Sequence, residues 1–308
     1  MTSSEDMRRE LIFAAKFSIY SNSILVALKL TVGLFTMSIS VISEAVHSGT
    51  DLLAAFIANY SVRKSTRPAD DTHKFGHGKY ESLSGAIEAT LILVAAGIII
   101  YESIWKLIEH SEVQIIEAGI FVMGISALLN FFVSRYLMRI AKKHNSLALE
   151  ADALHLKTDV WTSIGVFAGL IVVRVTNINE IDPLAALFVA AIIIHAALML
   201  TRRSTIELLD HSLTQEEERI ILATIKEVVG EMASYHGLRT RRSGRDRFVD
   251  FHLVVPKHLE VITAHAVCDK IEIRVKEKLP FSNLTIHIEP CIEDCAQCQI
   301  ASICKGEG

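Results

Sequence analysis

Two apolar stretches of the sequence each carry a histidine and an aspartate four residues apart. The first stretch holds His47 and Asp51, and the second holds His155 and Asp159. Residues at positions i and i+4 of an α-helix lie on one face, so each pair directs an imidazole and a carboxylate the same way. If the two faces meet, they supply two nitrogens and two oxygens around one point. That set is suited to tetrahedral coordination of Zn²⁺.

A less specific interpretation is that these residues are polar contacts that hold helices together, for about 1 kcal/mol or less each. An ionised aspartate at the centre of a bilayer costs roughly 2.5–3.5 kcal/mol on insertion scales, and such residues usually mark the path of an ion or proton. Because the same spacing occurs twice, a cation site is the better interpretation. Two imidazoles and two carboxylates favour zinc, while Co²⁺, Cd²⁺, Fe²⁺ and Ni²⁺ stay open because affinity discriminates them poorly.

The composition indicates a membrane protein with a modest soluble part. Of the 308 residues, 51% are hydrophobic, and the mean hydropathy is positive. The net charge of −4 gives no indication of nucleic-acid binding. No secretory signal is expected, because the first residues are polar and the apolar stretch after them is too long. Six apolar stretches are each near the ~20 residues that a spanning helix needs; they cover residues 11–36, 39–62, 80–108, 113–141, 147–175 and 182–204.

Basic residues predict how these spans are oriented. They gather before the first span, between the second and third, between the fourth and fifth, and after the sixth, whereas the alternate loops hold few. The excess of Lys and Arg marks cytoplasmic loops, so we expect both termini in the cytoplasm.

The character of the chain changes at about residue 211. An amphipathic helix is expected after Thr214, which would form a capping box with Glu217. Two strands joined at Ser243 and Gly244, a second helix and a third strand follow. We therefore predict an α-helical membrane protein with six transmembrane helices (residues 1–210), a small cytoplasmic α+β domain of order αββαβ (residues 211–290) and a cysteine-rich tail (residues 291–308).

Three further groups of residues have metal-ligand chemistry. Asp70, His73 and His77 lie in one polar loop and form a plausible three-ligand cation site, although a solvated loop would look similar. The predicted soluble domain carries four histidines in its elements and an acidic residue two positions after the last of them: His236, His252, His265, His287 and Glu289. Four thiols in the tail could bind zinc or an iron–sulfur cluster, or could simply be reduced thiols: Cys291, Cys295, Cys298 and Cys304.

Together, the six spans, the paired His-x-x-x-Asp, the loop PADDTHKFGHGKYESL and the αββαβ tail resemble the cation diffusion facilitator family, in its bacterial zinc/iron-efflux branch. The resemblance covers roughly residues 10–290. It implies a homodimeric antiporter, in a prokaryotic inner membrane, that exports divalent cations in exchange for protons. Many bacterial relatives carry Asp where this chain has His47, and the all-His/Asp set resembles the zinc-selective members.

The resemblance also assigns roles to the residues. His47, Asp51, His155 and Asp159 match the transport site, and the loop residues match a second cation site. The histidines of the soluble domain match a binuclear metal site between two protomers, where the bridging carboxylate is commonly Asp but is Glu289 here. Occupancy of that site would bring the protomers together.

Two other classes of protein fit less well. An enzyme such as a membrane zinc hydrolase is not expected, because the chain lacks His-Glu-x-x-His and four protein ligands would leave no open metal position. A non-transporting metal sensor or scaffold is the main alternative. It would gain nothing, however, from the cost of placing two His/Asp pairs inside a membrane.

Overall fold

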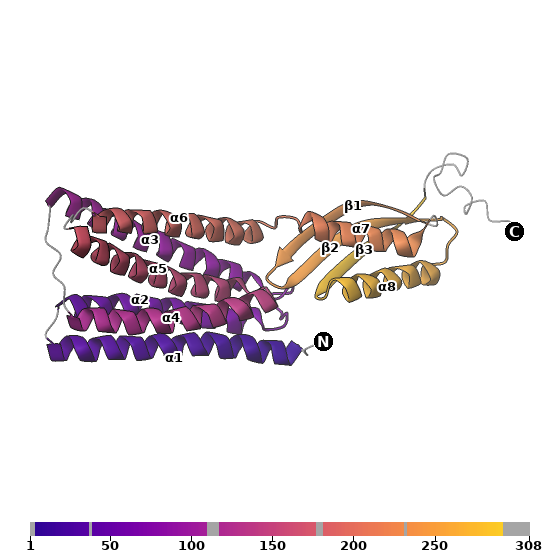
Figure 1. Ribbon diagram of the computed structural model, residues 1–308. Helices are drawn as coiled ribbons and strands as arrows, with labels where there is room; N and C mark the ends of the chain where they lie inside the picture. Colours follow the sequence, from indigo (N-terminus) through magenta and orange to yellow (C-terminus); the bar gives the residue numbers. More distant parts are fainter. Residues whose placement is uncertain (1–3, 37–38, 110–116, 177–180, 231–232, 292–308) are drawn as a thin grey trace. The chain divides into compact units, whose positions relative to one another are not determined.

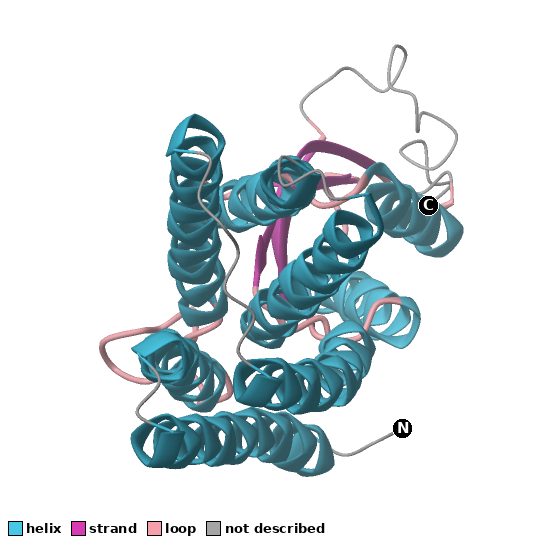
Figure 2. Ribbon diagram, turned by 60° about the vertical axis from the view of Figure 1, so that its left-hand side comes forward, coloured by secondary structure: helices cyan, strands magenta, loops and turns pink. Residues whose placement is uncertain are grey.

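The computed structural model describes residues 4–36, 39–109, 117–176, 181–230 and 233–291, and the chain divides into two units, Met1–Leu208 and Leu209–Gly308. The described part of the first unit is a bundle of six long helices (Figures 1 and 2). Their bounds are α1 Ser4–Thr36, α2 Ile39–Ser65, α3 Lys79–Glu109, α4 Glu117–His144, α5 Leu147–Thr176 and α6 Ile181–Leu208.

The helix α5 lies at the centre of this bundle. It packs against α2, α3, α4 and α6, and it contributes to both apolar clusters of the unit. One cluster joins it to α1 and α4, through residues such as Leu11, Leu137 and Leu156. The other joins it to α3 and α6, through residues such as Ile92 and Ile193. A change in the position of α5 would therefore disturb most of the bundle.

Three of the described helices are long and apolar enough to cross a membrane by composition alone; they run over Glu5–Phe35, Lys79–Trp105 and Pro183–Leu208. The helices α2, α4 and α5 are not among them, and α2 and α5 carry the two His/Asp pairs. Polar residues are tolerated in spanning helices when they face the bundle interior. The charged residues of α2 and α5 are therefore compatible with spanning helices that have a polar site between them.

The second unit is a two-layer α+β domain. It contains α7 Gln215–Val229, β1 Ser234–Ser243, β2 Asp246–Val255, α8 Val261–Lys278 and β3 Ser282–Pro290, which is the predicted αββαβ order. The sheet has the order β1-β2-β3; β1 pairs antiparallel with β2, and β2 pairs parallel with β3. The parallel pair needs a crossover, which α8 supplies.

Alternation along β2 decides which face of the sheet is covered. Val249, Phe251 and Leu253 are buried in one cluster with residues of α7 and α8 such as Ile225 and Ile271. Successive side chains of a strand point to opposite faces. The even-numbered residues of β2 therefore lie on the face that these two helices leave open.

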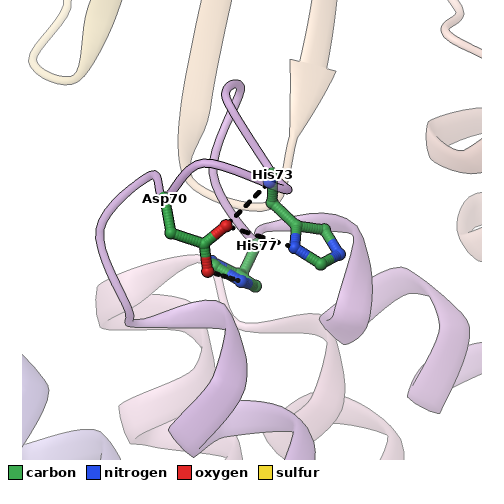
Figure 3. A group of neighbouring side chains, drawn as sticks. All are labelled: Asp70, His73 and His77. Atoms are coloured by element: carbon green, nitrogen blue, oxygen red, sulfur yellow. Dashed lines mark hydrogen bonds and ion pairs between the residues drawn. The ribbon is translucent and has the colours of Figure 1, made fainter.

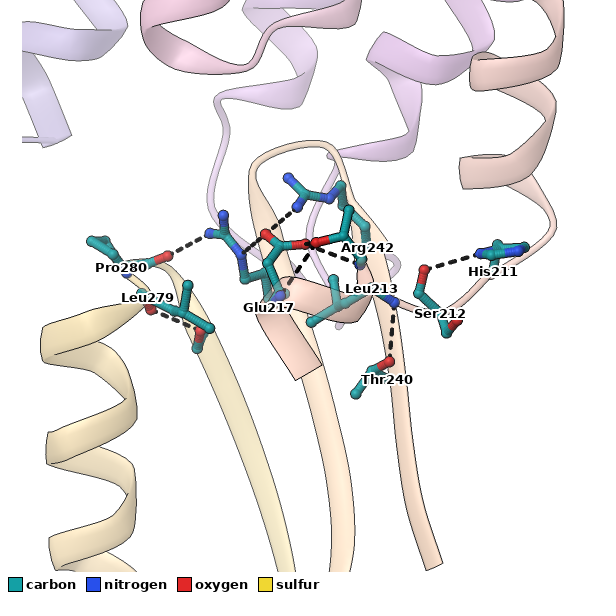
Figure 4. A network of polar contacts seen from close by, with 11 residues as sticks. His211, Ser212, Leu213, Glu217, Thr240, Arg242, Leu279 and Pro280 are labelled. Carbon is teal, nitrogen blue, oxygen red and sulfur yellow. Dashed lines mark hydrogen bonds and ion pairs between the residues drawn. The ribbon is translucent and has the colours of Figure 1, made fainter. Parts of the chain in front are cut away.

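A polar network fastens the start of α7 to the sheet (Figure 4). The predicted capping box is confirmed: the Thr214 hydroxyl accepts from the Glu217 amide at 3.3 Å, and the Glu217 carboxylate accepts from the Thr214 amide at 3.2 Å. The other carboxylate oxygen of Glu217 is bonded by Arg242 and, at 2.8 Å, by Arg247. Burial would raise the pKa of Glu217, but the two arginines lower it to about 2.

Candidate metal centres

The helices α2 and α5 bring the two His/Asp pairs together inside the bundle. His155 Nε2 lies 3.0 Å from Asp51 Oδ1, and His47 Nε2 lies 3.9 Å from Asp159 Oδ1. Each histidine therefore contacts the aspartate of the other helix. Ligand atoms of His47, Asp51 and Asp159 all lie within 4.8 Å of one another. His155 joins these three residues through its contact with Asp51, and we call the four residues the intramembrane cluster.

The intramembrane cluster is closed on one side and open on the other. Asp51 and His155 are only 4% and 5% exposed, whereas Asp159 is half-buried and His47 is exposed. The buried pair is also the more tightly bonded pair. A cation that reached the cluster would therefore meet His47 and Asp159 on the open side and a His–Asp hydrogen bond on the closed side.

Two buried polar residues beside the intramembrane cluster were missed from the sequence. Asn130 of α4 donates from Nδ2 to Asp159 Oδ2 at 3.5 Å, and Lys29 of α1 donates from Nζ to Ser48 Oγ at 2.8 Å. Both residues interrupt apolar stretches, which is a detectable signal. Their partners lie on other helices, and spacing within one helix cannot predict such pairs.

The start of α3 ties together the ends of the two ligand-bearing helices. Ser65, the last residue of α2, donates from Oγ to Glu81 Oε1 at 2.7 Å. The buried Glu81 carboxylate also lies against Ser146 and the backbone amides of Leu147 and Ala148, where α5 begins. A helix N-terminus attracts a carboxylate because its amides are unpaired and its dipole is positive there. Glu81 thus links α2 and α5 at one end of the bundle.

The loop between α2 and α3 brings its three predicted ligands together (Figure 3). Asp70 Oδ2 lies 3.2 Å from His77 Nε2, and Asp70 Oδ1 lies 3.4 Å from His73 Nδ1. Hydrogen bonds from the Thr72 hydroxyl and the His73 amide hold the pKa of Asp70 well below its usual range. Gly76, at φ +81°, makes the turn that brings His77 back towards His73. The geometry suits a small cation.

In the soluble domain, strand register aligns three histidines across the sheet. His236 of β1 is paired with His252 of β2, and His252 with His287 of β3. Glu289 lies two positions after His287, so both are on the same face. Its Oε2 is 3.0 Å from His236 Nε2, and its Oε1 is 2.6 Å from His252 Nδ1 and 3.7 Å from His287 Nε2. We call these four residues the sheet cluster.

Electrostatics and backbone geometry both support the sheet cluster. Hydrogen bonds from His252 and then from His236 lower the pKa of Glu289. The register of β1 shifts between His236 and Arg239, where Gly237 has φ +65°. A Cβ on Gly237 would lie 3.4 Å from His252 Cδ2. Glycine is therefore favoured there by its positive φ, and an added Cβ would contact the His252 ring.

The remaining predicted ligands are not placed with these clusters. His265 lies on α8, where its Nδ1 is 3.2 Å from Asp269 Oδ2, and α8 packs on the covered face of the sheet. Within the described residues of this one chain, His265 therefore stays apart from the sheet cluster. Cys291 is buried, and its amide donates to the Val255 carbonyl at 2.9 Å. Cys295, Cys298 and Cys304 lie outside the described residues.

Comparison with known proteins covers both units. A family model described as the cation efflux transmembrane domain matches residues 15–209, and one described as the cytoplasmic domain of cation efflux proteins matches residues 213–291. The uncharacterized transporter sll1263 of Synechocystis sp. is 34% identical over 267 residues, covering 87% of this chain and 86% of that protein. The cation-efflux pump FieF of Salmonella typhimurium is 31% identical over 269 residues, covering 87% of this chain and 89% of that protein. A solved zinc form of CzrB is 38% identical and covers 28% of this chain and 97% of its own, with a TM-score of 0.26.

The two family models together span nearly the whole chain, in the order in which the structure places its units. They confirm the predicted membrane domain of six helices and the cytoplasmic αββαβ domain, and they assign the chain to a class of transporters, not of enzymes. This integral membrane protein belongs to the cation diffusion facilitator family and is a cation efflux transporter.

Proposed function

We propose that this transporter exports Zn²⁺ in exchange for protons, works as a homodimer and uses the intramembrane cluster as its transport site. The observation that carries the proposal is the cross-helix pairing of His155 with Asp51 and of His47 with Asp159. Two imidazoles and two carboxylates are the ligand number and type that zinc takes in proteins, and ligand atoms of three of the four residues already lie within 4.8 Å of one another. The two carboxylates also balance the charge of a divalent ion.

The same contacts suggest how metal and protons compete. His155 Nε2, the atom that contacts Asp51, is also an atom that would bind zinc. A metal-ligating histidine must be neutral, so arrival of Zn²⁺ would displace any proton shared by the pair. Histidine suits this exchange because its ordinary pKa of about 6.5 lies near physiological pH. Protons from the opposite side would then release the zinc and reset the site.

Alternating access follows from the division of ligands between two helices. Because α2 and α5 each supply one histidine and one aspartate, a small movement of one helix against the other would take both cross-helix contacts apart. A rigid-body rocking of helices around a central site is a common way to expose it to each side in turn. The basic loops favour an orientation with both termini in the cytoplasm, and the family resemblance favours a prokaryotic inner membrane.

In the soluble domain, we assign the sheet cluster and His265 to a regulatory metal site between two protomers. His265 lies near one end of α8 together with Val261 and Ile262, which are 80% and 76% exposed. Exposed apolar side chains of this kind are typical of interaction surfaces. A second chain that covered them could bring its own His265 to a partner's sheet cluster. The loop cluster of Asp70, His73 and His77 would collect metal before transport.

The cysteine tail is a separate predicted site for zinc or an iron–sulfur cluster. Metal content of the purified protein with and without residues 291–308 tests it. Equal content in the two proteins would remove the tail from the list of sites.

Zinc flux into proteoliposomes tests the transport proposal. Uptake should rise with an opposing pH gradient, and Asp159→Ala should abolish it while the dimer persists on gel filtration. Glu102→Gln, a change at an exposed position of α3, is the control and should transport normally. Uptake that ignores the pH gradient would contradict proton exchange, and full activity of Asp159→Ala would contradict the site. Competition by Cd²⁺, Co²⁺ and Fe²⁺ in the same assay ranks the metals.

A further inference from the structure

Four buried polar atoms between α3 and α5 have no hydrogen-bond partner among the described residues. They are Glu88 Oε2, both carboxylate oxygens of Asp152, and His155 Nδ1, and Ser18 of α1 is a polar side chain of another helix that lies near Asp152. Glu88 and Asp152 are each 0% exposed, and His155 is 5% exposed. Nearly all buried polar groups in native proteins are hydrogen-bonded, and an exception often marks a bound water or ion. So many unpartnered atoms on three neighbouring side chains therefore point to a ligand.

Packing places the three residues in one region. Ala89 and Ile92, next to Glu88, share an apolar cluster with Ala151 and Leu154, which flank Asp152. The two carboxylates are near enough to interact electrostatically. Asp152 precedes His155 by three residues, so the two lie on one face of α5. This region is therefore one helical turn from the intramembrane cluster, on the side where α5 begins.

Two buried carboxylates close together favour the binding of a cation in this region. Two carboxylates in a dry interior repel each other and lose their hydration. Glu88 receives one hydrogen bond, from Ser84 Oγ at 3.2 Å, and in the described part of the chain neither carboxylate has an ion pair with Lys or Arg. A divalent cation would satisfy both carboxylates and cancel their charge.

We propose that Glu88 and Asp152 bind a divalent cation as a staging site, one turn from the transport site. The proposal rests on the proposed function, since the staged ion is the ion to be transported. His155 links the two positions: its Nε2 belongs to the intramembrane cluster, and its unpartnered Nδ1 is on the other side of the same ring. A cation held by the two carboxylates needs to move only along one face of α5 to reach the intramembrane cluster.

Zinc content after equilibrium dialysis tests the staging site, with the transport site disabled so that the two are counted separately. The parent protein is the Asp51→Asn/Asp159→Asn variant of the full chain, and the comparison adds Glu88→Gln and Asp152→Asn. We expect the added pair of changes to remove one zinc per chain. The matched control adds Glu102→Gln, an exposed glutamate of the same helix, and should remove none. Equal zinc content with and without the added pair would overturn the proposal.

Two readouts keep this result independent of folding and of the transport site. Amides have nearly the same shape as carboxylates and carry no buried charge. Without metal, the variant that carries the added pair of changes should therefore melt at the same temperature as the parent protein or at a higher one. A lost zinc with an intact melting transition supports the staging site. The flux assay on Asp159→Ala separately tests the intramembrane cluster, so either idea can fail alone. If the pair only holds a proton, zinc content will not change, and the staging site is refuted.

Discussion

The intramembrane cluster and the sheet cluster contain the same kinds of side chain, but they are held in different ways. In the membrane domain, His155 contacts Asp51 across two helices and 104 positions of sequence. In the soluble domain, His236, His252 and His287 lie on adjacent strands that are joined by backbone hydrogen bonds. Sliding or rocking can separate two packed helices, whereas separating paired strands breaks the sheet. The first arrangement suits a site that must open in each cycle, and the second suits a site that reports occupancy.

Removing a ligand from each cluster should give the largest difference between them. Asp51→Ala deletes the partner of His155 in the transport site, and we expect zinc uptake to fall by about 100-fold or more, as loss of a directly bonded ionic partner in a buried site does. Glu289→Ala deletes the shared carboxylate of the sheet cluster and should leave most of the uptake at saturating zinc. Initial rates in proteoliposomes check both. Equal losses in the two variants would show that the clusters do not have separate tasks.

The next test breaks strand geometry without touching a ligand. Gly237→Ala places a methyl group in contact with the His252 ring at a positive φ, so the backbone beside His236 must shift to relieve the strain. Zinc affinity of the sheet cluster should therefore fall by about tenfold, in the range for lost supporting contacts around metal ligands. Calorimetry of zinc binding measures this fall, and uptake by the transport site should not change.

Gly230→Ala is the matched control for that test. Gly230 also has a positive φ, but a Cβ there would have no atom within 4 Å among its described surroundings. Both variants carry backbone strain, and only one of them crowds a histidine. If Gly230→Ala weakens zinc binding as much as Gly237→Ala does, contact with His252 is not the cause.

A substitution of Glu81 tests whether zinc binding by the intramembrane cluster depends on the positions of α2 and α5, just as zinc binding by the sheet cluster is expected to depend on strand geometry. Glu81→Gln keeps an oxygen for Ser65 but removes the negative charge that the carboxylate places at the positive start of α5. We expect about a tenfold weaker zinc affinity at the transport site, in the range for lost supporting contacts. Spin labels on α2 and α5 should report a broader distance distribution. Ser65→Ala, which removes only the α2 contact, should have a smaller effect.

The smallest expected effect is that of Glu217→Gln on the stability of the soluble domain and on its dependence on acid pH. The pKa of Glu217 is about 2, so its ionised form stabilises the fold fully above pH ~4.5, and this contribution is lost as the pH falls through 2. At pH 7, Glu217→Gln should speed hydrogen exchange of the β2 amides by about fivefold, or ~1 kcal/mol. The variant should also lose less stability than the unmodified protein between pH 5 and pH 2. Faster exchange in the membrane helices would contradict this local role.

The sequence predicted the members of each cluster better than their contacts. Spacing of four residues correctly placed His155 and Asp159 on one face of α5, but it could not say that His155 would contact Asp51, because the rotation of one helix against another depends on packing. Asn130 and Glu81 were missed for the same reason. In the soluble domain, the alternation of apolar and polar residues along β2 predicted that His252 lies on the uncovered face of the sheet. It could not show that His265 would lie on the covered side, with α8.

X-ray absorption at the zinc edge tests the central claim most directly. The sample is a variant in which alanine replaces the loop and soluble-domain histidines, Glu88→Gln and Asp152→Asn remove the staging site, and the chain stops after Pro290, so that the intramembrane cluster dominates the signal. The account predicts about four nitrogen and oxygen ligands near 2.0–2.1 Å with imidazole scattering, and loss of that signal in Asp51→Ala. A spectrum without imidazole, or one that Asp51→Ala leaves unchanged, would contradict it.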